Sequence, residues 1–550
     1  MVCKGDILEL EIENMGSNGE GIAKADGFPV FVKDSVPGDL CLIKVTKVKK
    51  SFAYGHLLEV IKASKDRVAA ICPVSKRCGG CAIQAVSYER QLSYKSDRVY
   101  DCLKRIGGIP DDILAASQDG TVGMEEPFRY RNKAQYPIGM DREGRVTAGF
   151  YAARSHSIVP VNDCLLLPEE FSGILKSVLD FIEANDITVY DEEKRKGLIR
   201  HLVLRKAFAT GETMAVLVIN GRSIPHEGEL ISILKRLDVK TALVNINREN
   251  TNVILGEKER ILFGEGYITD ELCGLRFRIS AQSFYQVNPH IASEIYDTVL
   301  EYADLSGNEE VWDVCCGIGT ISLVMAKKAG RVLGIEIVPD AIRDAKINAE
   351  LNGSKNVEFI CAAAEEELPD LIKDPAVKPV LTVLDPPRSG MERPALDAVI
   401  KASPQKIIYV SCDPATLARD VRILSQSGYE LKRFRTYDQF CQTAHVETVV
   451  SLSLKSDSPK IEVSMKPGED SLYEPQDKGT YKKIKAYILE KYGFKVSSLY
   501  IAQVKDKCGL DKERIGNAWK KSENTHVPVC PKEKEDAIMD AFRHFGLIDE

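Results

Sequence analysis

The sequence predicts an α/β protein built around a parallel sheet, with a small β-barrel before it, a central α+β domain and a small helical module at the end. Three observations predict this. Apolar strands alternate with helical patterns from residue 290 onward, glycine interrupts short strands in the first sixty residues, and apolar residues recur at helical spacing after residue 480. A chain of 550 residues is too long for one hydrophobic core, so we expect several domains.

The first domain, residues 1–62, is predicted to be the barrel. Strands are expected at Asp6–Ile12, Pro29–Val32, Leu40–Val48 and Ala53–Ile61, with glycines between them. About five short strands in so short a segment favour a closed barrel of the oligonucleotide-binding type. A small β-module without a ligand is the alternative interpretation.

Two basic clusters bear on whether the partner is a nucleic acid. The net charge is −7, but binding depends on local basic surfaces more than on the net charge of a multidomain chain. One cluster lies near a predicted strand end in the barrel, and the other is interleaved with aromatic residues. The clusters are Lys44, Lys47, Lys49 and Lys50, and Arg129, Arg131 and Lys133 with Phe128, Tyr130 and Tyr136. The barrel cluster leads us to expect RNA binding.

The central domain is predicted over residues 63–280. It contains a helical stretch, Ser87–Ile106, and strand-rich stretches at Arg129–Val161 and Arg200–Asn220. The chain has no apolar run of about 18 residues, and its first residues are too polar for a signal peptide, so we expect a cytoplasmic protein without a membrane partner. In that reducing compartment, its 15 cysteines are not expected to form a disulfide framework.

Four of these cysteines predict a metal site in the central domain. Cys72, Cys78 and Cys81 lie within ten residues, and the glycines between the last two permit tight turns. Cys164 is the best candidate for a fourth ligand. Four thiolates fit either a structural zinc ion or an iron–sulfur cluster, and the spacing leaves both open.

The main domain is predicted over residues 281–455. Its apolar strands are expected at Val311–Val314, Val332–Ile335, Val380–Leu384 and Ile407–Val410, separated by helical patterns that indicate βαβ units. Residues 456–478 are polar and contain proline, which is typical of a linker. Residues 479–550 form the predicted helical module.

The first predicted strand of the main domain leads into a candidate cofactor loop. Gly317 and Gly319 allow the backbone to approach a ligand at the start of a helix, and Glu336 ends the next strand. A carboxylate at this spacing accepts hydrogen bonds from the two ribose hydroxyls of a nucleoside. Because Ser322 replaces the third glycine of the dinucleotide motif, we expect S-adenosylmethionine rather than NAD.

Three residues at further strand ends predict covalent chemistry on a pyrimidine. Asp385 opens a loop stiffened by two prolines, Cys412 follows the strand Ile407–Val410, and Glu447 lies beyond the next strand. Carbon 5 of a pyrimidine is a poor nucleophile, and a thiolate that adds to carbon 6 activates it. Glu447 is then the candidate base for the carbon-5 proton, and Arg419 is a candidate partner of the thiolate. A buried structural thiol and a surface carboxylate are the alternative interpretations of Cys412 and Glu447.

In these residues the sequence resembles the RNA uracil-C5 methyltransferase family, in its ribosomal-RNA branch. The resemblance covers residues 1 to about 455. It is carried by the first sixty residues, which look like a TRAM domain, by the four cysteines, by the cofactor loop and by the Asp385 loop. Three further segments complete it: Phe284–Asn288, Ser411–Pro414 and His445–Glu447.

The resemblance implies a fold and a role for each matching residue. The main domain would have the Rossmann-like fold of class I S-adenosylmethionine-dependent methyltransferases. Cys412 would be the nucleophile and Glu447 the general base, and the four cysteines would hold a 4Fe-4S cluster. The cofactor would be contacted by Gln286, Cys315, Gly317, Gly319, Glu336 and Asp385. Family members commonly carry an aromatic residue where this chain has Cys315.

The resemblance also implies a substrate. The barrel and the cysteine set favour methylation of a uridine in 23S ribosomal RNA by a monomeric enzyme. One alternative is a transfer-RNA uracil-C5 methyltransferase built on the same core. The alternative from a different class is a non-catalytic RNA-binding protein that helps ribosomal RNA to fold. The particular uridine is not specified by the sequence.

Overall fold

The computed structural model describes residues 2–374, 378–455, 481–494, 496, 498–508, 530–545 and 547. The chain divides into two compact units, residues 1–458 and residues 459–550. In the part of the chain that is described, no helix is long and apolar enough to cross a membrane. The predicted linker at residues 456–478 lies outside the described residues.

The amino-terminal domain is a closed barrel of five strands in the order β1-β2-β3-β5-β4. The strands are β1 (Ile7–Met15), β2 (Gly21–Ala25), β3 (Phe28–Val32), β4 (Leu40–Val48) and β5 (Ala53–Lys62). The predicted barrel is therefore confirmed, but β2 falls where only turn glycines were expected. Gly21 begins β2, and its lack of a side chain is required by close packing. A Cβ at this position would lie 2.2 Å from Ser35 Oγ and 2.6 Å from Ile12 Cγ2.

A seven-stranded sheet forms most of the central domain, in the order β13-β12-β11-β10-β7-β8-β9. Its strands are β7 (Lys133–Met140), β8 (Val146–Tyr151), β9 (Ile158–Pro160), β10 (Ile199–Lys206), β11 (Thr213–Ile219), β12 (Thr241–Ile246) and β13 (Lys258–Phe263). Helices α3 (Glu170–Ala184) and α4 (Glu227–Arg236) pack on one face, where Phe171 and Leu230 meet Leu217 in one buried cluster. A separate pair, β14 (Tyr267–Leu272) and β15 (Leu275–Ser280), follows.

The main domain is an eight-stranded sheet in the order β18-β17-β16-β19-β20-β22-β21-β6. Its strands are β6 (Gln118–Val122), β16 (Glu310–Val314), β17 (Arg331–Glu336), β18 (Val357–Cys361), β19 (Leu381–Leu384), β20 (Lys406–Ser411), β21 (Tyr429–Tyr437) and β22 (Glu447–Leu454). The strands β16 to β20 pair in parallel, as the βαβ pattern predicts, whereas β22 is antiparallel to both of its neighbours. The edge strand β6 comes from the stretch assigned to the central domain, and it pairs with β21.

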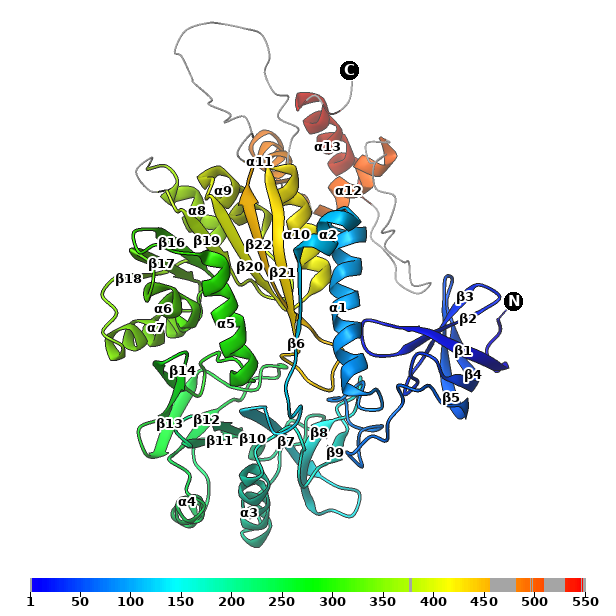
Figure 1. Ribbon diagram of the computed structural model, residues 1–550, viewed down its shortest axis with the longest axis vertical. Helices are drawn as coiled ribbons and strands as arrows, with labels where there is room; N and C mark the ends of the chain where they lie inside the picture. Colours follow the sequence, from blue (N-terminus) through cyan, green and yellow to red (C-terminus); the bar gives the residue numbers. More distant parts are fainter. Residues whose placement is uncertain are drawn as a thin grey trace, which may run out of the picture. The chain divides into compact units, whose positions relative to one another are not determined.

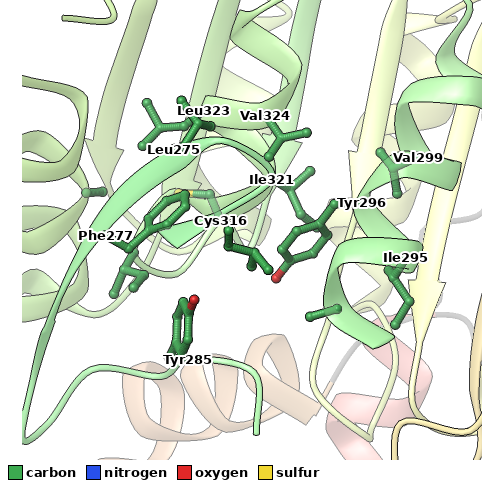
Figure 2. Packing of buried hydrophobic residues seen from close by; sticks show 14 of the residues in the cluster. Leu275, Phe277, Tyr285, Ile295, Tyr296, Val299, Cys316, Ile321, Leu323 and Val324 are labelled. Carbon is green, nitrogen blue, oxygen red and sulfur yellow. The ribbon is translucent and has the colours of Figure 1, made fainter. Parts of the chain in front are cut away.

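Helices cover both faces of this sheet because its strands are apolar on both sides. They are α1 (Tyr88–Arg105), α2 (Asp111–Ser117), α5 (Pro289–Ala303), α6 (Thr320–Ala326), α7 (Pro339–Leu351), α8 (Ala364–Leu371), α9 (Arg393–Ala402) and α10 (Pro414–Gln426). In β16, Val311 joins the buried cluster beneath α5, α6 and α7, and Trp312 joins the cluster beneath α1, α9 and α10. Figure 2 shows Tyr296 of α5 next to Ile321 of α6 in the first cluster, which also contains Phe277 of β15.

The carboxyl-terminal unit contains three described helices, α11 (Tyr481–Tyr492), α12 (Ser498–Lys507) and α13 (Lys532–His544). They share a small core of their own, in which Ile484, Ile488, Ile501, Val504, Ile538 and Phe542 are fully buried. The apolar spacing that predicted helices in this module is therefore confirmed over the residues described.

Candidate active site

Strand order and register bring the predicted reactive residues together. Asp385 follows β19 and Cys412 follows the neighbouring strand β20, so both lie at the carboxyl edge of the parallel strands. Glu447 begins β22, which runs antiparallel to β20 with Ser411 opposite Thr448. Cys412 and Glu447 are the next residues on these two strands, and the antiparallel register therefore places them side by side.

Cys412 lies between the end of β20 and the start of α10. Asp413 caps the helix, since its Oδ1 accepts the N–H groups of Ala415 (2.9 Å) and Thr416 (3.0 Å). The Cys412 side chain is partly exposed. Burial raises the pKa of this thiol to about 11, as does the nearby carboxylate of Glu447, while Arg388 lowers it. The thiol is thus accessible but needs help to ionise.

Glu447 is a buried carboxylate with 4% of its surface exposed. Burial raises its pKa to about 8, with a further contribution from Asp385, while Arg388 lowers it. Glu447 is therefore not the surface carboxylate of the alternative interpretation, and its role as the base stays a prediction. A carboxyl group with a pKa near 8 suits a general base at neutral pH better than an ordinary carboxylate does.

Arg388 is a site residue that the sequence analysis did not single out. It is exposed on the loop after β19, and its carbonyl accepts a hydrogen bond from Thr416 Oγ1 (3.2 Å), which ties this loop to α10. Its guanidinium lowers the pKa of both Cys412 and Glu447. Its position directly after Asp385-Pro386-Pro387 was the available signal.

Arg419 has a different role from the one we expected. It forms an ion pair with the buried Asp420 (2.8 Å) and donates to the carbonyls of Ser389 (3.1 Å) and Met391 (3.3 Å). Arg419 therefore holds the loop after β19 in place, and the interpretation of Arg419 as the thiolate's partner is not supported. The charge of Arg388 lowers the pKa of the Cys412 thiol.

The candidate cofactor loop is shaped by backbone contacts to Glu336. The Gly317 N–H donates to Oε2 of Glu336 (3.1 Å), and the Val338 N–H donates to Oε1 (2.9 Å). Gly319 caps α6 with a φ of +81°, and Cys315 has a φ of +68°, which is unusual for a residue with a side chain. These bonds fix the Glu336 carboxylate at the end of β17, where the spacing predicted it.

A cavity of about 200 Å³ lies beside this loop. Its walls combine an apolar surface, which includes Cys315, Ile337, Ala363 and Pro387, with the carboxylates of Glu336, Glu365 and Glu392. A ribose bound to Glu336 and an adenine against Ile337 and Ala363 suit these walls.

Two further carboxylates near this loop favour a cationic ligand. Burial, together with the charges of Asp313 and Glu336, raises the pKa of Asp385 to about 7. Burial also raises the pKa of Asp313 to about 6, and its Oδ1 is buried without a hydrogen-bond partner. These carboxylates would gain from the positive charges of S-adenosylmethionine.

Gln286 lies apart from the residues that line this cavity. It is buried on the loop between β15 and α5, and its Oε1 accepts a hydrogen bond from Gln439 Nε2 (3.0 Å). The structure thus connects Gln286 to the loop that precedes Glu447. Its predicted contact with the cofactor stays a prediction, as do the roles of the other site residues.

The four predicted ligand cysteines approach one another. The loop with Cys72, Cys78 and Cys81 docks on the end of β8, where the Gly79 N–H donates to the carbonyl of Tyr151 (3.0 Å). Burial, together with the charges of Cys164, Cys78 and Cys72, raises the pKa of the Cys81 thiol to about 12. Four cysteine thiolates close to one another are the ligands that an iron–sulfur cluster requires.

The structure does not show the predicted metal site itself. Among the described residues, no group of three or more histidine, cysteine, aspartate or glutamate side chains is arranged to hold a metal ion. The four thiols therefore do not have the geometry of a metal site in this structure, and the 4Fe-4S cluster stays a prediction.

The two basic clusters differ in exposure. Lys44, Lys47, Lys49 and Lys50 are all exposed on β4 and the turn after it. In the second cluster, the Arg129 guanidinium is engaged by both carboxylate oxygens of Asp163 (2.6 and 2.7 Å), and the rings of Tyr130 and Tyr136 are buried. The second cluster is therefore mainly structural, and only the barrel cluster presents a basic surface.

Two family models match the chain. One, described as tRNA (Uracil-5-)-methyltransferase, matches residues 236–455, and the other, described as TRAM domain, matches residues 1–58. The first match includes the candidate cofactor loop, Asp385, Cys412 and Glu447. The second coincides with the closed barrel.

Curated relatives resemble this chain over almost their whole length. An uncharacterised RNA methyltransferase from Halalkalibacterium halodurans is 45% identical over 457 residues, which is 83% of this chain and 98% of the relative. Another from Clostridium acetobutylicum is 45% identical over 451 residues, covering 82% and 97%.

A solved structure is also similar. It is the Pyrococcus abyssi tRNA (uracil-54, C5)-methyltransferase in complex with S-adenosyl-L-homocysteine, with 26% identity and a TM-score of 0.64. The similarity covers 81% of this chain and 100% of that one.

Proposed function

Because this chain belongs to the RNA uracil-5 methyltransferase family, we propose that it methylates carbon 5 of a specific uridine in 23S ribosomal RNA through a covalent bond to Cys412. The observation that carries the covalent mechanism is the register of β20 and β22, which places Cys412 beside the buried carboxylate of Glu447. The target uridine must leave its base stack to reach them.

Cys412 performs the first step. Its thiolate adds to carbon 6 of the uracil, and the electron pair of the C5–C6 double bond moves toward the carbonyl at carbon 4, which makes carbon 5 nucleophilic. Arg388 assists because its positive charge favours the thiolate form of Cys412. When bound, S-adenosylmethionine supplies the methyl group that carbon 5 accepts.

Glu447 completes the reaction. Its carboxylate takes the proton from carbon 5, the released electron pair restores the C5–C6 double bond, and the Cys412 thiolate leaves carbon 6. Gly317, Gly319 and Glu336 are proposed to hold the nucleoside part of the cofactor, with Cys315, Asp385 and Gln286 as further contacts.

Trapping with 5-fluorouridine RNA tests the covalent step. Fluorine at carbon 5 cannot leave as a proton does, so wild-type protein should accumulate a covalent RNA adduct that survives denaturation. Cys412→Ala should form no adduct while still binding S-adenosylmethionine, and Cys102→Ala, which removes a half-buried thiol of α1, is the matched control. Unchanged methylation by Cys412→Ala would rule out the covalent mechanism.

Mapping of methyluridine tests the substrate. The barrel and its basic surface support a large structured RNA, and in cells that lack the protein we expect methyluridine to disappear from 23S ribosomal RNA. The similar Pyrococcus enzyme acts on uridine 54 of transfer RNA, which favours transfer RNA as the second candidate substrate. Loss of methyluridine from transfer RNA alone would overturn the ribosomal assignment in favour of that candidate.

The cysteine set is proposed to hold a 4Fe-4S cluster with a structural or RNA-folding role. The mutual nearness of Cys72, Cys78, Cys81 and Cys164 supports this proposal. Protein purified without oxygen should be brown and contain about four irons and four sulfides per chain. Bound zinc without sulfide would contradict it.

A protein that binds RNA but never methylates it would point instead to the non-catalytic alternative.

A further inference from the structure

The loop that connects β21 to β22, residues 438–446, joins two parts of the candidate site, and we call it the base loop. Near its start, Gln439 donates from Nε2 to Oε1 of Gln286 (3.0 Å), and the Gln439 carbonyl accepts from Nδ2 of Asn288 (3.4 Å). Glu447 follows its last residue. A displacement of the base loop would therefore move the proposed base and a proposed cofactor contact together.

Helix α1 holds the base loop from outside (Figure 1). Lys95 forms a fully buried ion pair with Asp438, and its ammonium also donates to the carbonyl of Phe440 (3.2 Å). Arg98 Nη1 donates to the carbonyl of Ala444 (2.8 Å). Both ends of the loop are thus tied to one helix.

Gln442 is the point where the base loop meets the segment after Cys81. Its carbonyl accepts the N–H groups of Ala82 (3.1 Å) and Ile83 (3.2 Å), and its side-chain Oε1 accepts from Gln91 Nε2 (3.0 Å). Gln442 is buried and has a φ of +68°, a left-handed conformation that residues with a side chain rarely adopt. The three external hydrogen bonds hold this residue in a conformation that its own backbone disfavours.

We propose that Gln442 is a positioning residue for methyl transfer, which fixes the base loop through Gln91 and the segment after Cys81 and thereby fixes Glu447 beside the uracil. The inference rests on the proposed function, because it takes Glu447 as the base. It adds a role for the segment after the cysteine loop, because the N–H groups of Ala82 and Ile83 donate to the carbonyl of Gln442 in the base loop.

The consequence is selective for the second half of the reaction. Cys412 follows β20 and lies outside the base loop, so addition to carbon 6 should survive a displacement of that loop. Removal of the carbon-5 proton should not, because Glu447 must lie within hydrogen-bond reach of it. A displaced base loop should therefore leave the methylated RNA bound to Cys412 as a covalent adduct.

The test compares Gln442→Met, which removes the acceptor of the hydrogen bond from Gln91, with Gln91→Met, which removes its donor. Both keep side-chain length, but Gln91→Met also removes hydrogen bonds to the carbonyls of Ile83 (3.2 Å) and Val86 (2.9 Å), so Gln442→Met is the more specific variant. With ordinary RNA from cells that lack the protein, each should lower turnover about 10- to 100-fold, as expected for small displacements of a catalytic group, and should accumulate denaturation-resistant adduct. The double variant should be no worse than the single variants. Gln118→Ala, which breaks a hydrogen bond to Ser96 Oγ of the same helix (2.8 Å), is the matched control and should behave as wild type.

The outcomes separate positioning from general damage. Wild-type turnover without adduct in both variants would overturn the role of Gln442. A fall in turnover accompanied by an equal fall in adduct formation on 5-fluorouridine RNA would also overturn it, because a general loss of structure affects Cys412 equally. If wild-type protein forms no adduct on 5-fluorouridine RNA, the covalent mechanism itself fails, and the inference fails with it.

Discussion

At the scale of single residues, the candidate site places the Cys412 thiol and the exposed Arg388 beside two carboxylates, Asp385 and Glu447. Each carboxylate raises the pKa of a neighbouring group. Asp385 raises the pKa of Glu447, and Glu447 raises that of Cys412. Arg388 opposes both effects. The proposed nucleophile and the proposed base therefore do not titrate independently, and their order of ionisation depends on which charges a bound cofactor and RNA bring to the site.

Glu447→Gln should separate the two halves of the reaction. The amide cannot accept the carbon-5 proton, so turnover should fall at least about 100-fold, which is the lower range of general-base effects. The addition to carbon 6 should persist, so a covalent adduct should accumulate on ordinary RNA, visible as a retarded band in a denaturing gel. Glu430→Gln, a half-buried residue of β21, is the control. Loss of turnover without any adduct would assign Glu447 to the first half of the reaction instead.

Activity and stability should respond to pH in opposite directions. Glu447 has a pKa of about 8 in the folded protein against an ordinary value of 4.5, so the folded protein retains this proton and the unfolded chain releases it in that range. The contribution of Glu447 to stability is therefore lost as pH rises from 4.5 to 8, whereas the fraction of active base increases. Thermal unfolding of wild type and Glu447→Gln should agree at pH 5, and the variant should be the more stable at pH 9. Equal melting temperatures at pH 9 would contradict the raised pKa.

At the scale of elements, α1 serves both the fold and the site. Four of its residues contact the base loop, and their spacing of three and four places them on one face of the helix. They are Tyr88, Gln91, Lys95 and Arg98. Farther along the helix, Val99 and Leu103 follow Lys95 at intervals of four and contribute to the core of the main domain. The helix therefore fixes the β21–β22 connection relative to the sheet.

Lys95→Met tests this role of α1. The substitution leaves Asp438 as an uncompensated charge in the interior, which costs about 3–5 kcal/mol in comparable buried pairs. We expect a correspondingly lower unfolding free energy in urea. Lys104→Met on the same helix removes an exposed ion pair with Asp111 (2.7 Å) and should change little. A similar loss of unfolding free energy in both variants would show that the buried ion pair stabilises the fold no more than the exposed one does.

At the scale of the whole catalytic unit, the barrel, the cysteine loop and the base loop form one continuous set of contacts. The barrel touches α1, since Tyr94 OH donates to the carbonyls of Met15 (3.0 Å) and Gly16 (2.6 Å). A Cβ on Gly19 of the barrel would lie 2.8 Å from Ile83, directly after the cysteine loop. The barrel, to which RNA is proposed to bind, therefore contacts α1 and the segment after the cysteine loop, and both of these contact the base loop directly.

Removal of three barrel lysines should weaken RNA binding without affecting the chemistry. The triple variant Lys44→Ala, Lys47→Ala and Lys50→Ala loses three exposed charges. For each phosphate that these lysines neutralise, the slope of log affinity against log salt should become shallower by about 0.9 for a duplex or about 0.7 for a single strand. Filter binding over a range of salt concentrations measures this slope. An unchanged slope would place the RNA elsewhere, and unchanged single-turnover methylation at saturating RNA is the control for the active site.

Much of the fold and part of the site could be predicted from local patterns. The helix at 87–106 and the four apolar strands of the main domain were found within a residue or two, because period and apolar content are properties of short segments. Edge and antiparallel strands were harder. β6 and β21 have mixed burial, and β2 begins at a glycine whose role depends on Ser35 and Ile12 across the barrel.

The candidate reactive groups and the candidate cofactor loop could be identified from the sequence alone, since Cys412, Asp385 and Gly317 follow strands that are recognisable from their own residues. Only the tertiary structure decided that Glu447 lies beside Cys412, that the charge of Arg388 lowers the pKa of the thiol, and that Gln442 connects the base loop to the cysteine loop. The physical reason is that strand periodicity is set by neighbouring residues. Antiparallel register, burial and charge coupling depend on segments hundreds of residues apart, such as α1 and the β21–β22 connection.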